Sequence, residues 1–348
     1  MNKRNLPTII IIILIIGFAF YVFSADTIFA KEEEKYQVEL LTVLTTAYDP
    51  FNTQAMMGVY FAERSGIADA EFTLIGDDAG LADYFKKTAL KNPNLICGVG
   101  FTLQESMYNS ALENPNIDYL TVDMTYTEDD IPGNMANIIF RSNEASYVAG
   151  YVAGMTTETN KIGFVGGMNT SIIQGFYYGF MAGISRAEIT KLKKINVSLE
   201  YADSYIDPYT GAEIAEKMYN DGVDIIYSVA GVTGNGVIST AAVKNKYVIG
   251  VDTDQNYMAP ENVIFSVIKK IDTSINTTIA DYAAGKKHGG EVISLGYAEN
   301  GVDVVNYLDC IDPKVIEEAD FLKEDIKTGR IIVPYTKEEY EDYLHREL

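Results

Sequence analysis

The stretch Asp224-Ile-Ile-Tyr-Ser-Val-Ala230 is mostly apolar after its first residue, which is typical of a strand buried on both faces of a sheet. A second such run, Lys246-Tyr-Val-Ile-Gly-Val251, follows after a helical stretch over 235–244. Two buried strands joined through a helix predict a parallel pair with a right-handed crossover. This unit therefore predicts an α/β fold.

Short apolar runs alternate with helical patterns along the rest of the chain. Strands are expected at 37–45, 71–76, 94–101, 118–123, 135–141, 161–166, 196–202, 224–230, 247–252, 262–267 and 291–297. Helices are expected at 52–65, 81–90, 103–113, 143–157, 171–187, 210–221, 235–244 and 272–286. So many strands exceed a comfortable single open sheet, and the pattern therefore predicts two sheets.

Polar and aromatic residues follow several of the expected strands. In α/β sheets, ligands bind outside the carboxyl ends of the strands. Phe51 and Asn52 come after the first strand, and Asp123 ends the fourth. The glycine-rich turn 231–236 follows the strand at 224–230, and Asp252 ends the next one. We therefore expect these residues to lie at one binding site.

The composition excludes several classes of function. The 348 residues carry 27 Lys+Arg against 49 Asp+Glu, a net charge of −22, which argues against nucleic acid or anionic lipid headgroups as partners. The 47% of hydrophobic residues suffices for the cores of two lobes. Two histidines, His288 and His345, and two cysteines, Cys97 and Cys310, cannot build a histidine-rich or four-cysteine metal site. No metal or cofactor is therefore expected.

The N-terminus has the pattern of an export signal. Lys3 and Arg4 precede an apolar run over 9–23 that is about the shortest able to span a bilayer. We expect residues 1–30 to be a signal peptide or an N-terminal membrane anchor, with 31–36 as a tether. No cysteine follows the run, so a lipoprotein is not expected. The body of the protein is predicted to be extracytoplasmic.

Seven segments stand out along the chain, in this order: Phe51-Asn52-x-x-Ala55-x-x-Gly58, Glu144-Ala-Ser-Tyr-Val-Ala-Gly-Tyr-Val-Ala-Gly-Met155, Lys161-Ile-Gly-Phe-Val-Gly-Gly167, Asp224-Ile-Ile-Tyr…Thr233-Gly-Asn-Gly236, Gly250-Val-Asp-Thr-Asp-Gln255, Ser266-Val-Ile-Lys269 and Ile326-Lys-Thr-Gly-Arg-Ile-Ile-Val-Pro334. Together they resemble the basic membrane protein family, which comprises extracytoplasmic substrate-binding proteins of ABC transporters with purine-nucleoside-binding members. The resemblance covers about residues 37–335.

This resemblance implies the type I periplasmic-binding-protein fold, in which two Rossmann-like lobes are joined by three crossings of the chain. The crossings are expected near Asp123, Asp252 and Ser294. Lobe 1 would then comprise 37–123 with 253–292. Lobe 2 would comprise 124–252 with 293–348.

The resemblance also implies an aromatic sandwich around a purine base. Phe51 and Tyr205 fall on the two stacking positions, one from each lobe, although Tyr205 stands where the family usually has phenylalanine. Asp123 would accept a hydrogen bond from the base edge, with Asn52 beside it. From the residues alone, the alternatives are that Phe51 is a hydrophobic staple, Tyr205 an exposed loop residue and Asp123 a helix cap or a partner of backbone amides.

A second set of residues is implied for the sugar. Asp252 would take the ribose hydroxyls and Lys269 would hydrogen-bond the same diol, while Gly231 and Gly234 would let the backbone approach. The alternatives are an Asp254–Lys ion pair and a solvated Lys269. The loop ahead of Phe51 departs from the family because it is shortened and carries Thr45 or Thr46 in place of an aspartate.

Three functions remain open at this stage. The first is a receptor that captures a purine nucleoside by hinge closure and docks on the permease subunits of an ABC importer, without catalysis. The second is a nucleoside hydrolase that would place Asp49, Asp252 and Asp254 around a metal ion. The third is a sensory ectodomain for a related small molecule. The resemblance favours the first.

Overall fold

The computed structural model describes residues 35–43, 49–76, 80–126 and 129–347. The expected signal or anchor at 1–30, most of the tether, and Thr45, Thr46 and Tyr48 lie outside the described residues. Within the part of the chain that the structure describes, no helix combines the length and the apolar character needed to cross a bilayer.

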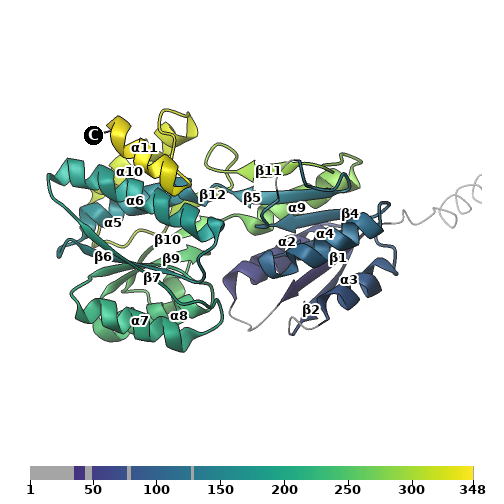
Figure 1. Cartoon of the computed structure of the whole chain (residues 1–348), viewed down its shortest axis with the longest axis horizontal. Coiled ribbons are helices and arrows are strands. Elements are labelled where there is room, and N and C mark those ends of the chain that lie inside the picture. The colour runs from purple at the N-terminus through teal and green to yellow at the C-terminus, as the bar shows by residue number, and fades with distance from the viewer. Residues whose placement is uncertain (1–34, 44–48, 77–79, 127–128, 348) are drawn as a thin grey trace, which may run out of the picture. The chain divides into compact units, whose positions relative to one another are not determined.

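Strands and helices alternate over most of the described chain (Figure 1). The strands are β1 (Tyr36–Val43), β2 (Ala68–Ile75), β3 (Leu95–Val99), β4 (Asp118–Val122), β5 (Met135–Phe140), β6 (Lys161–Gly166), β7 (Asn196–Tyr201), β8 (Ile225–Val229), β9 (Tyr247–Asp252), β10 (Val263–Lys269), β11 (Val292–Leu295) and β12 (Val302–Val305). The helices are α2 (Pro50–Arg64), α3 (Leu81–Ala89), α4 (Gln104–Glu113), α5 (Ser142–Thr156), α6 (Ser171–Lys191), α7 (Pro208–Asn220), α8 (Thr233–Lys244), α9 (Ile271–Ala283), α10 (Pro313–Lys327) and α11 (Lys337–Glu347), with short 3₁₀ turns at Phe101–Leu103 and Asn256–Met258.

The strands form two sheets, as the sequence predicts. Their orders are β11-β5-β4-β3-β1-β2 and β12-β10-β9-β8-β6-β7. The pairs within the series β1–β3–β4–β5–β11 and β7–β6–β8–β9–β10 are parallel, whereas β12 runs antiparallel to β10. The order β2-β1-β3-β4-β5 in the first sheet matches β7-β6-β8-β9-β10 in the second, and the α/β prediction is confirmed.

Helix starts are set by capping residues next to proline. Asp49 accepts a hydrogen bond from the Asn52 amide and precedes Pro50 at the start of α2, and Asp207 caps α7 in the same way before Pro208. The first cap therefore fixes the helical turn that carries Phe51, and the second lies two residues after Tyr205.

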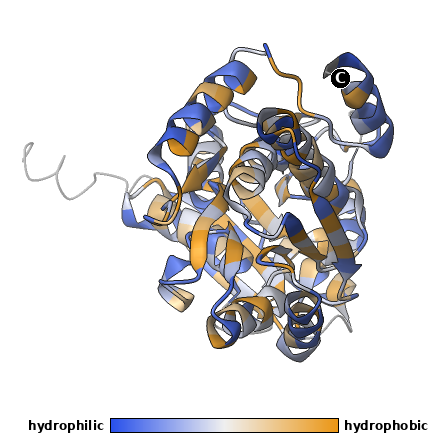
Figure 2. Ribbon diagram, turned by 90° about the vertical axis from the view of Figure 1, so that its left-hand side faces the viewer, coloured by the Kyte–Doolittle hydropathy of each residue, from blue (hydrophilic) through white to orange (hydrophobic). Residues whose placement is uncertain are grey.

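Each sheet has its own hydrophobic core. Strands β3 and β8 are buried over their whole length, which accounts for their continuous apolar sequences. Figure 1 shows α5 and α6 on one face of the second sheet and α7 and α8 on the other. Figure 2 shows the hydrophobic residues concentrated on the strands inside this layer of helices.

Helices α5 and α6 pack closely because glycines meet backbone at their contact. A Cβ on Gly183 would come within 1.9 Å of the Tyr147 carbonyl oxygen, and one on Gly150 within 2.1 Å of the Phe180 carbonyl oxygen. The Gly-rich sequence of 144–155 is therefore explained by helix packing rather than by ligand contact.

The strand pairing differs from the expected lobe boundaries in two places. Strand β5 pairs with β4 and belongs to the first sheet, although 124–252 was expected in lobe 2. Strand β10 pairs with β9 and belongs to the second sheet, although 253–292 was expected in lobe 1. The chain passes between the sheets one strand later than expected, after β5 and after β10, because each strand-end aspartate is followed by one further strand in its own sheet.

Candidate functional site

Seven of the eight predicted site residues line one cavity of about 470 Å³ between the carboxyl ends of the two sheets. These residues are Phe51, Asn52, Asp123, Tyr205, Gly231, Asp252 and Lys269. The volume falls within the ~300–1,000 Å³ typical of small-molecule sites. Gly234 lies instead inside the first turn of α8, where a Cβ would come within 2.6 Å of the Ser228 hydroxyl.

A buried cation between two carboxylates forms the polar centre of the cavity. The Lys269 ammonium lies 2.5 Å from Asp123 Oδ2 and 3.7 Å from Asp252 Oδ1. The side chains of Lys269 and Asp123 are only 5% and 8% exposed. Lys269 ends β10 of the second sheet, whereas Asp123 follows β4 of the first, so their ion pair spans the two sheets. The alternative of a solvated Lys269 is therefore wrong.

Burial and the neighbouring opposite charges shift the pKa of each of Asp252 and Lys269 in opposite directions. Burial raises the pKa of the Asp252 carboxyl to about 6, with Lys269 opposing the rise and the Asp123 carboxylate adding to it. Burial also disfavours the Lys269 ammonium, but Asp123 and Asp252 outweigh it, and the pKa of Lys269 is raised. The cation is therefore held firmly, while Asp252 gains or loses its proton close to neutral pH.

Both aspartates have backbone angles that favour glycine. The φ angle is +54° at Asp123 and +65° at Asp252, in the left-handed region that side chains other than glycine rarely adopt. Asp123 directly follows β4 and Asp252 is the last residue of β9, and these two strands hold the same place in the two strand orders. Aspartate is among the few residues besides glycine that adopt this conformation readily, so the strand ends accommodate it while presenting a carboxylate to the cavity.

Aromatic rings from both sheets line the cavity. Phe51 comes from the first sheet's half and Tyr205 from the second's, as the sequence predicts, and Phe101 and Phe176 are further lining residues that it did not. The rings of Phe101 and Tyr205 lie 5.8 Å apart at 56°. The Lys269 ammonium lies 5.4 Å from the Phe51 ring and 4.9 Å from the Phe176 ring, within the range of cation–π attraction.

Close packing against glycines fixes Tyr205. A Cβ on Gly167 would come within 2.3 Å of the Tyr205 ring, and one on Gly231, whose φ is +56°, would lie 3.2 Å from the Tyr205 carbonyl oxygen. The Thr233 amide donates to that same carbonyl. The glycine turn therefore supports the Tyr205 loop, and burial raises the pKa of the Tyr205 hydroxyl, which stays protonated.

Asn52 is occupied by its own neighbours. Its side-chain amide donates to the Val43 carbonyl at 2.8 Å and to Asp49 Oδ2 at 2.7 Å, and its oxygen accepts from the Thr42 hydroxyl at 2.7 Å. Burial raises the pKa of the Asp49 carboxyl, with hydrogen bonds from Asn52 opposing the rise. Because both donors of Asn52 are engaged, the side chain connects the end of β1 to the start of α2 rather than offering a free donor to a ligand.

Asp49, Asp252 and Asp254, the three carboxylates that a metal-dependent hydrolase would use, do not all line one cavity. Asp254 is not among the residues lining the cavity, and its carboxylate accepts from the Asn256 backbone amide and from the Asn306 side chain. Among the residues that the structure describes, no three His, Cys, Asp or Glu side chains group closely enough to hold a metal ion.

Comparison of the sequence with known families confirms the resemblance. The family described as ABC transporter substrate-binding protein PnrA-like matches residues 37–337. Basic membrane protein D of Borreliella burgdorferi (strain JD1) is 37% identical over 275 residues, 78% of this chain and 77% of that protein. Basic membrane protein A of Borreliella afzelii is 37% identical over 300 residues, 84% of this chain and 90% of that protein.

Solved structures share the fold. A solute-binding protein of an ABC transporter system from Aeropyrum pernix K1 superposes with a TM-score of 0.78 at 23% identity, covering 89% of this chain and 96% of that one. Another from Conexibacter woesei DSM 14684 gives 0.70 at 18% identity, covering 86% and 99%. These likenesses confirm the periplasmic-binding-protein architecture. Membership in the substrate-binding family implies a small-molecule ligand and permease partners. The chain belongs to the PnrA-like family of ABC transporter substrate-binding proteins, with the basic membrane proteins among its relatives.

Proposed function

We propose that this protein captures a purine nucleoside between its two lobes and presents it to the permease of an ABC importer. The observation that carries the proposal is the placement of Phe51, Tyr205, Asp123, Asp252 and Lys269 around one cavity with contributions from both sheets. A planar base needs aromatic faces, and a ribose needs paired hydrogen-bonding groups. The cavity offers both.

In the proposed complex, the base lies between Phe51 and Tyr205. Stacking contributes on the order of 1–3 kcal/mol for each base–aromatic contact. Both faces of the base are covered only when the lobes close, so ligand binding favours the closed arrangement. Asp123 accepts from an N–H of the base edge, and Asp252 and Lys269 bind the ribose hydroxyls.

The charges favour a nucleoside over a nucleotide. Among the described residues that line the cavity, Asp49, Asp123, Asp203 and Asp252 are acidic, and Lys269 is the one cation. Lys269 already pairs with Asp123 at 2.5 Å. A phosphate would therefore meet an acidic cavity whose cation is engaged, and its burial would be costly.

Native mass spectrometry and calorimetry of the purified protein test the proposal. We expect a bound nucleoside, or micromolar or tighter binding of inosine, guanosine or adenosine, and no binding of the corresponding monophosphates. Asp252→Ala should weaken binding of the nucleoside. Neither the wild type nor this variant should release free base from it. Absence of binding by all three nucleosides would refute the proposed ligand.

Residues 1–30 lie outside the described part of the chain. We propose, from their sequence, that they export the protein or anchor it to the outer face of the membrane. Fractionation of cells that express the full chain, with N-terminal sequencing of the product, would distinguish a cleaved signal from a retained anchor. Recovery of the product in the cytoplasm with Met1 intact would contradict both.

A further inference from the structure

A second, larger chamber adjoins the proposed ligand cavity. It has a volume of about 800 Å³, and Asp123, Thr125, Ser171 and Ile172 line both spaces. These four residues therefore mark the boundary between the two. Asp123 is proposed to accept a hydrogen bond from the edge of the base. The chamber therefore adjoins the position that this edge of the base would occupy.

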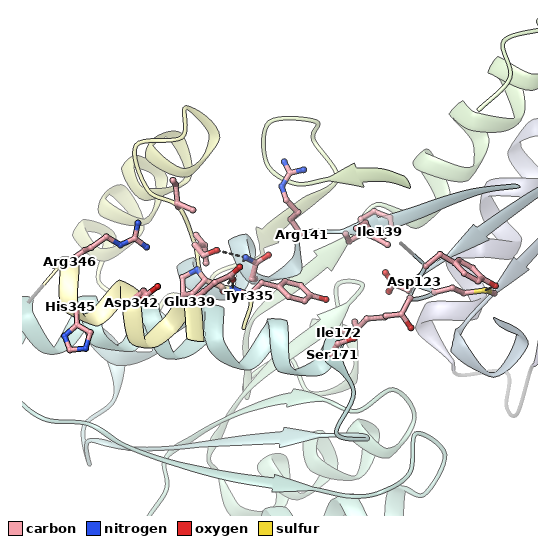
Figure 3. Close-up of a pocket in the computed structure, with 18 residues that line it drawn as sticks. Asp123, Ile139, Arg141, Ser171, Ile172, Tyr335, Glu339, Asp342, His345 and Arg346 are labelled. Atoms are coloured by element: carbon pink, nitrogen blue, oxygen red, sulfur yellow. Dashed lines mark hydrogen bonds between the residues drawn. The ribbon is translucent and has the colours of Figure 1, made fainter. Parts of the chain in front are cut away.

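The inner walls of the chamber are largely apolar. One wall contains Ile139 and Phe140 at the end of β5, with Met124 after β4. The opposite wall contains Ile172 at the start of α6 and the segment 332–335. Figure 3 shows Ile139 near Asp123, with the charged residues Asp342, His345 and Arg346 of α11 at the far end. A group that entered past Asp123, Thr125 and Ser171 would reach the apolar side chains of Ile139 and Phe140.

Hydrogen bonds and close packing hold the wall formed by 332–335. The Asn143 side chain donates to the Val333 carbonyl at 2.9 Å. The Tyr335 ring lies so close to α6 that a Cβ on Gly175 would come within 2.4 Å of it. Burial, with a smaller contribution from Asp123, raises the pKa of the Tyr335 hydroxyl to about 12, so it remains protonated. The chamber is therefore bounded by fixed groups in this structure.

We propose that the chamber is a subsite for a substituent on the exocyclic amine of the base. The ligands would then include purine nucleosides that carry one apolar or aromatic group on that amine. A singly substituted amine keeps one N–H for Asp123 while its substituent continues into the chamber. This inference rests on the proposed nucleoside function, and it extends the ligand class beyond the unmodified nucleosides.

Matched nucleoside pairs test the inference by calorimetry on the purified full chain. The pairs are adenosine with N6-benzyladenosine, and guanosine with N2-benzylguanosine. For whichever parent binds more tightly, we expect the benzyl analogue to have a dissociation constant no more than about three-fold higher. The reason is that the benzyl group fits in the chamber and buries its apolar surface against the protein. N6-benzyl-N6-methyladenosine, which keeps no N–H, should bind at least about ten-fold more weakly than N6-benzyladenosine because Asp123 loses its donor.

A bulky side chain placed in the chamber should weaken binding of the benzyl analogue and leave binding of its parent nearly unchanged. Ile139 and Ile332 line the chamber but not the ligand cavity, and Ile332 is 69% exposed, so its replacement should not impair folding. Ile139→Trp or Ile332→Trp should weaken the benzyl analogue by about ten-fold or more while changing the parent by less than about two-fold. Ile189→Trp is the matched control, because Ile189 lies on α6, is 37% exposed and lines neither space.

The outcomes are distinguishable. Failure of every nucleoside to bind refutes the proposed function itself. Binding of a parent with loss of more than about ten-fold for its benzyl analogue refutes the subsite alone, as would an equal effect of both tryptophan variants on parent and analogue. Binding of inosine without binding of adenosine or guanosine also refutes the subsite, because Asp123 would then not accept a hydrogen bond from an exocyclic amine.

Discussion

The side-chain amide of Gln54 donates a 2.7 Å hydrogen bond to the backbone carbonyl oxygen of Asp252. Gln54 lies on α2, beside the first sheet, and Asp252 ends β9 of the second. The bond therefore joins the two halves at Asp252, one of the aspartates with a positive φ. It lies outside the residues that line the cavity, so it acts on the ligand only through Asp252.

Removing this bond should weaken ligand binding without removing a ligand contact. A hydrogen bond of this kind is worth about 1 kcal/mol, so Gln54→Ala should raise the nucleoside dissociation constant about five-fold. Gln54→Glu should be worse, because a carboxylate cannot donate and would face the carbonyl oxygen. Calorimetry measures both, with thermal melting as the control for folding. Affinities equal to the wild type in both variants would contradict a role in closure.

The aromatic pair should contribute equally from the two halves. Phe51→Ala and Tyr205→Ala should each weaken nucleoside binding by about ten-fold or more, from the energy of base–aromatic stacking. Phe321→Ala is the matched control, because Phe321 on α10 is 64% exposed and lines neither cavity. Unchanged calorimetric affinity in both cavity variants would reject the sandwich.

Lys269 should matter to stability as well as to binding. Lys269→Met leaves the buried carboxylates of Asp123 and Asp252 without their cation, which should lower the free energy of unfolding by about 3–5 kcal/mol. Adding Asp123→Asn to this variant should recover part of the loss, since one buried charge is removed. Urea denaturation measures both proteins. A single variant as stable as the wild type would show that the ion pair carries no net stability.

Asp252 should make stability depend on pH between about 4 and 6. Burial raises its pKa in the folded protein to about 6 from 3.8, so the folded state binds the proton more tightly than the unfolded chain. This contribution to stability is present in full below pH 4 and is lost as the pH rises through 6, an effect on the order of 2–3 kcal/mol.

The variant Asp252→Asn isolates this contribution. It should flatten the stability profile over the same pH range and be more stable than the wild type at pH 7. Urea denaturation at several pH values measures the difference between the two proteins. An identical slope in both would mean that Asp252 does not titrate in this range. Asp123, Asp49 and Lys269 face the same carboxyl and remain in both proteins, so they cancel in the comparison.

The sequence alone predicted most of the elements because buried parallel strands are apolar along their whole length. Runs such as 94–101 and 224–230 contain β3 and β8. Strand β12 was missed, because its four residues include Asp303 and form too short a run to recognise. Helix α10 was also missed, although Asp312-Pro313 and the spacing of Val315, Ala319, Leu322 and Ile326 signal its start and its buried face.

The site was predictable only as far as strand ends reveal it. Asp123 and Asp252 could be found because they end strands, but the assignment of β5 and β10 to sheets depends on pairing between distant segments. The contribution of Phe101 and Phe176 depends on which way a loop and a helix face, which periodicity does not fix. That Asn52 is fully hydrogen-bonded follows from the positions of Thr42 and Asp49, which only the folded chain brings together.

Lys269 is the last residue of β10, and Phe140, whose ring lies 6.0 Å from the Lys269 ammonium, is the last residue of β5. Both therefore sit where the chain passes from one sheet to the other. In the closure that we propose, the two halves rotate about these crossings, so a residue at a crossing moves little. The Phe101–Tyr205 contact lies away from the crossings. Opening would therefore separate the two rings and leave the Lys269 ammonium nearly in place, ready to bind a ligand before the halves close.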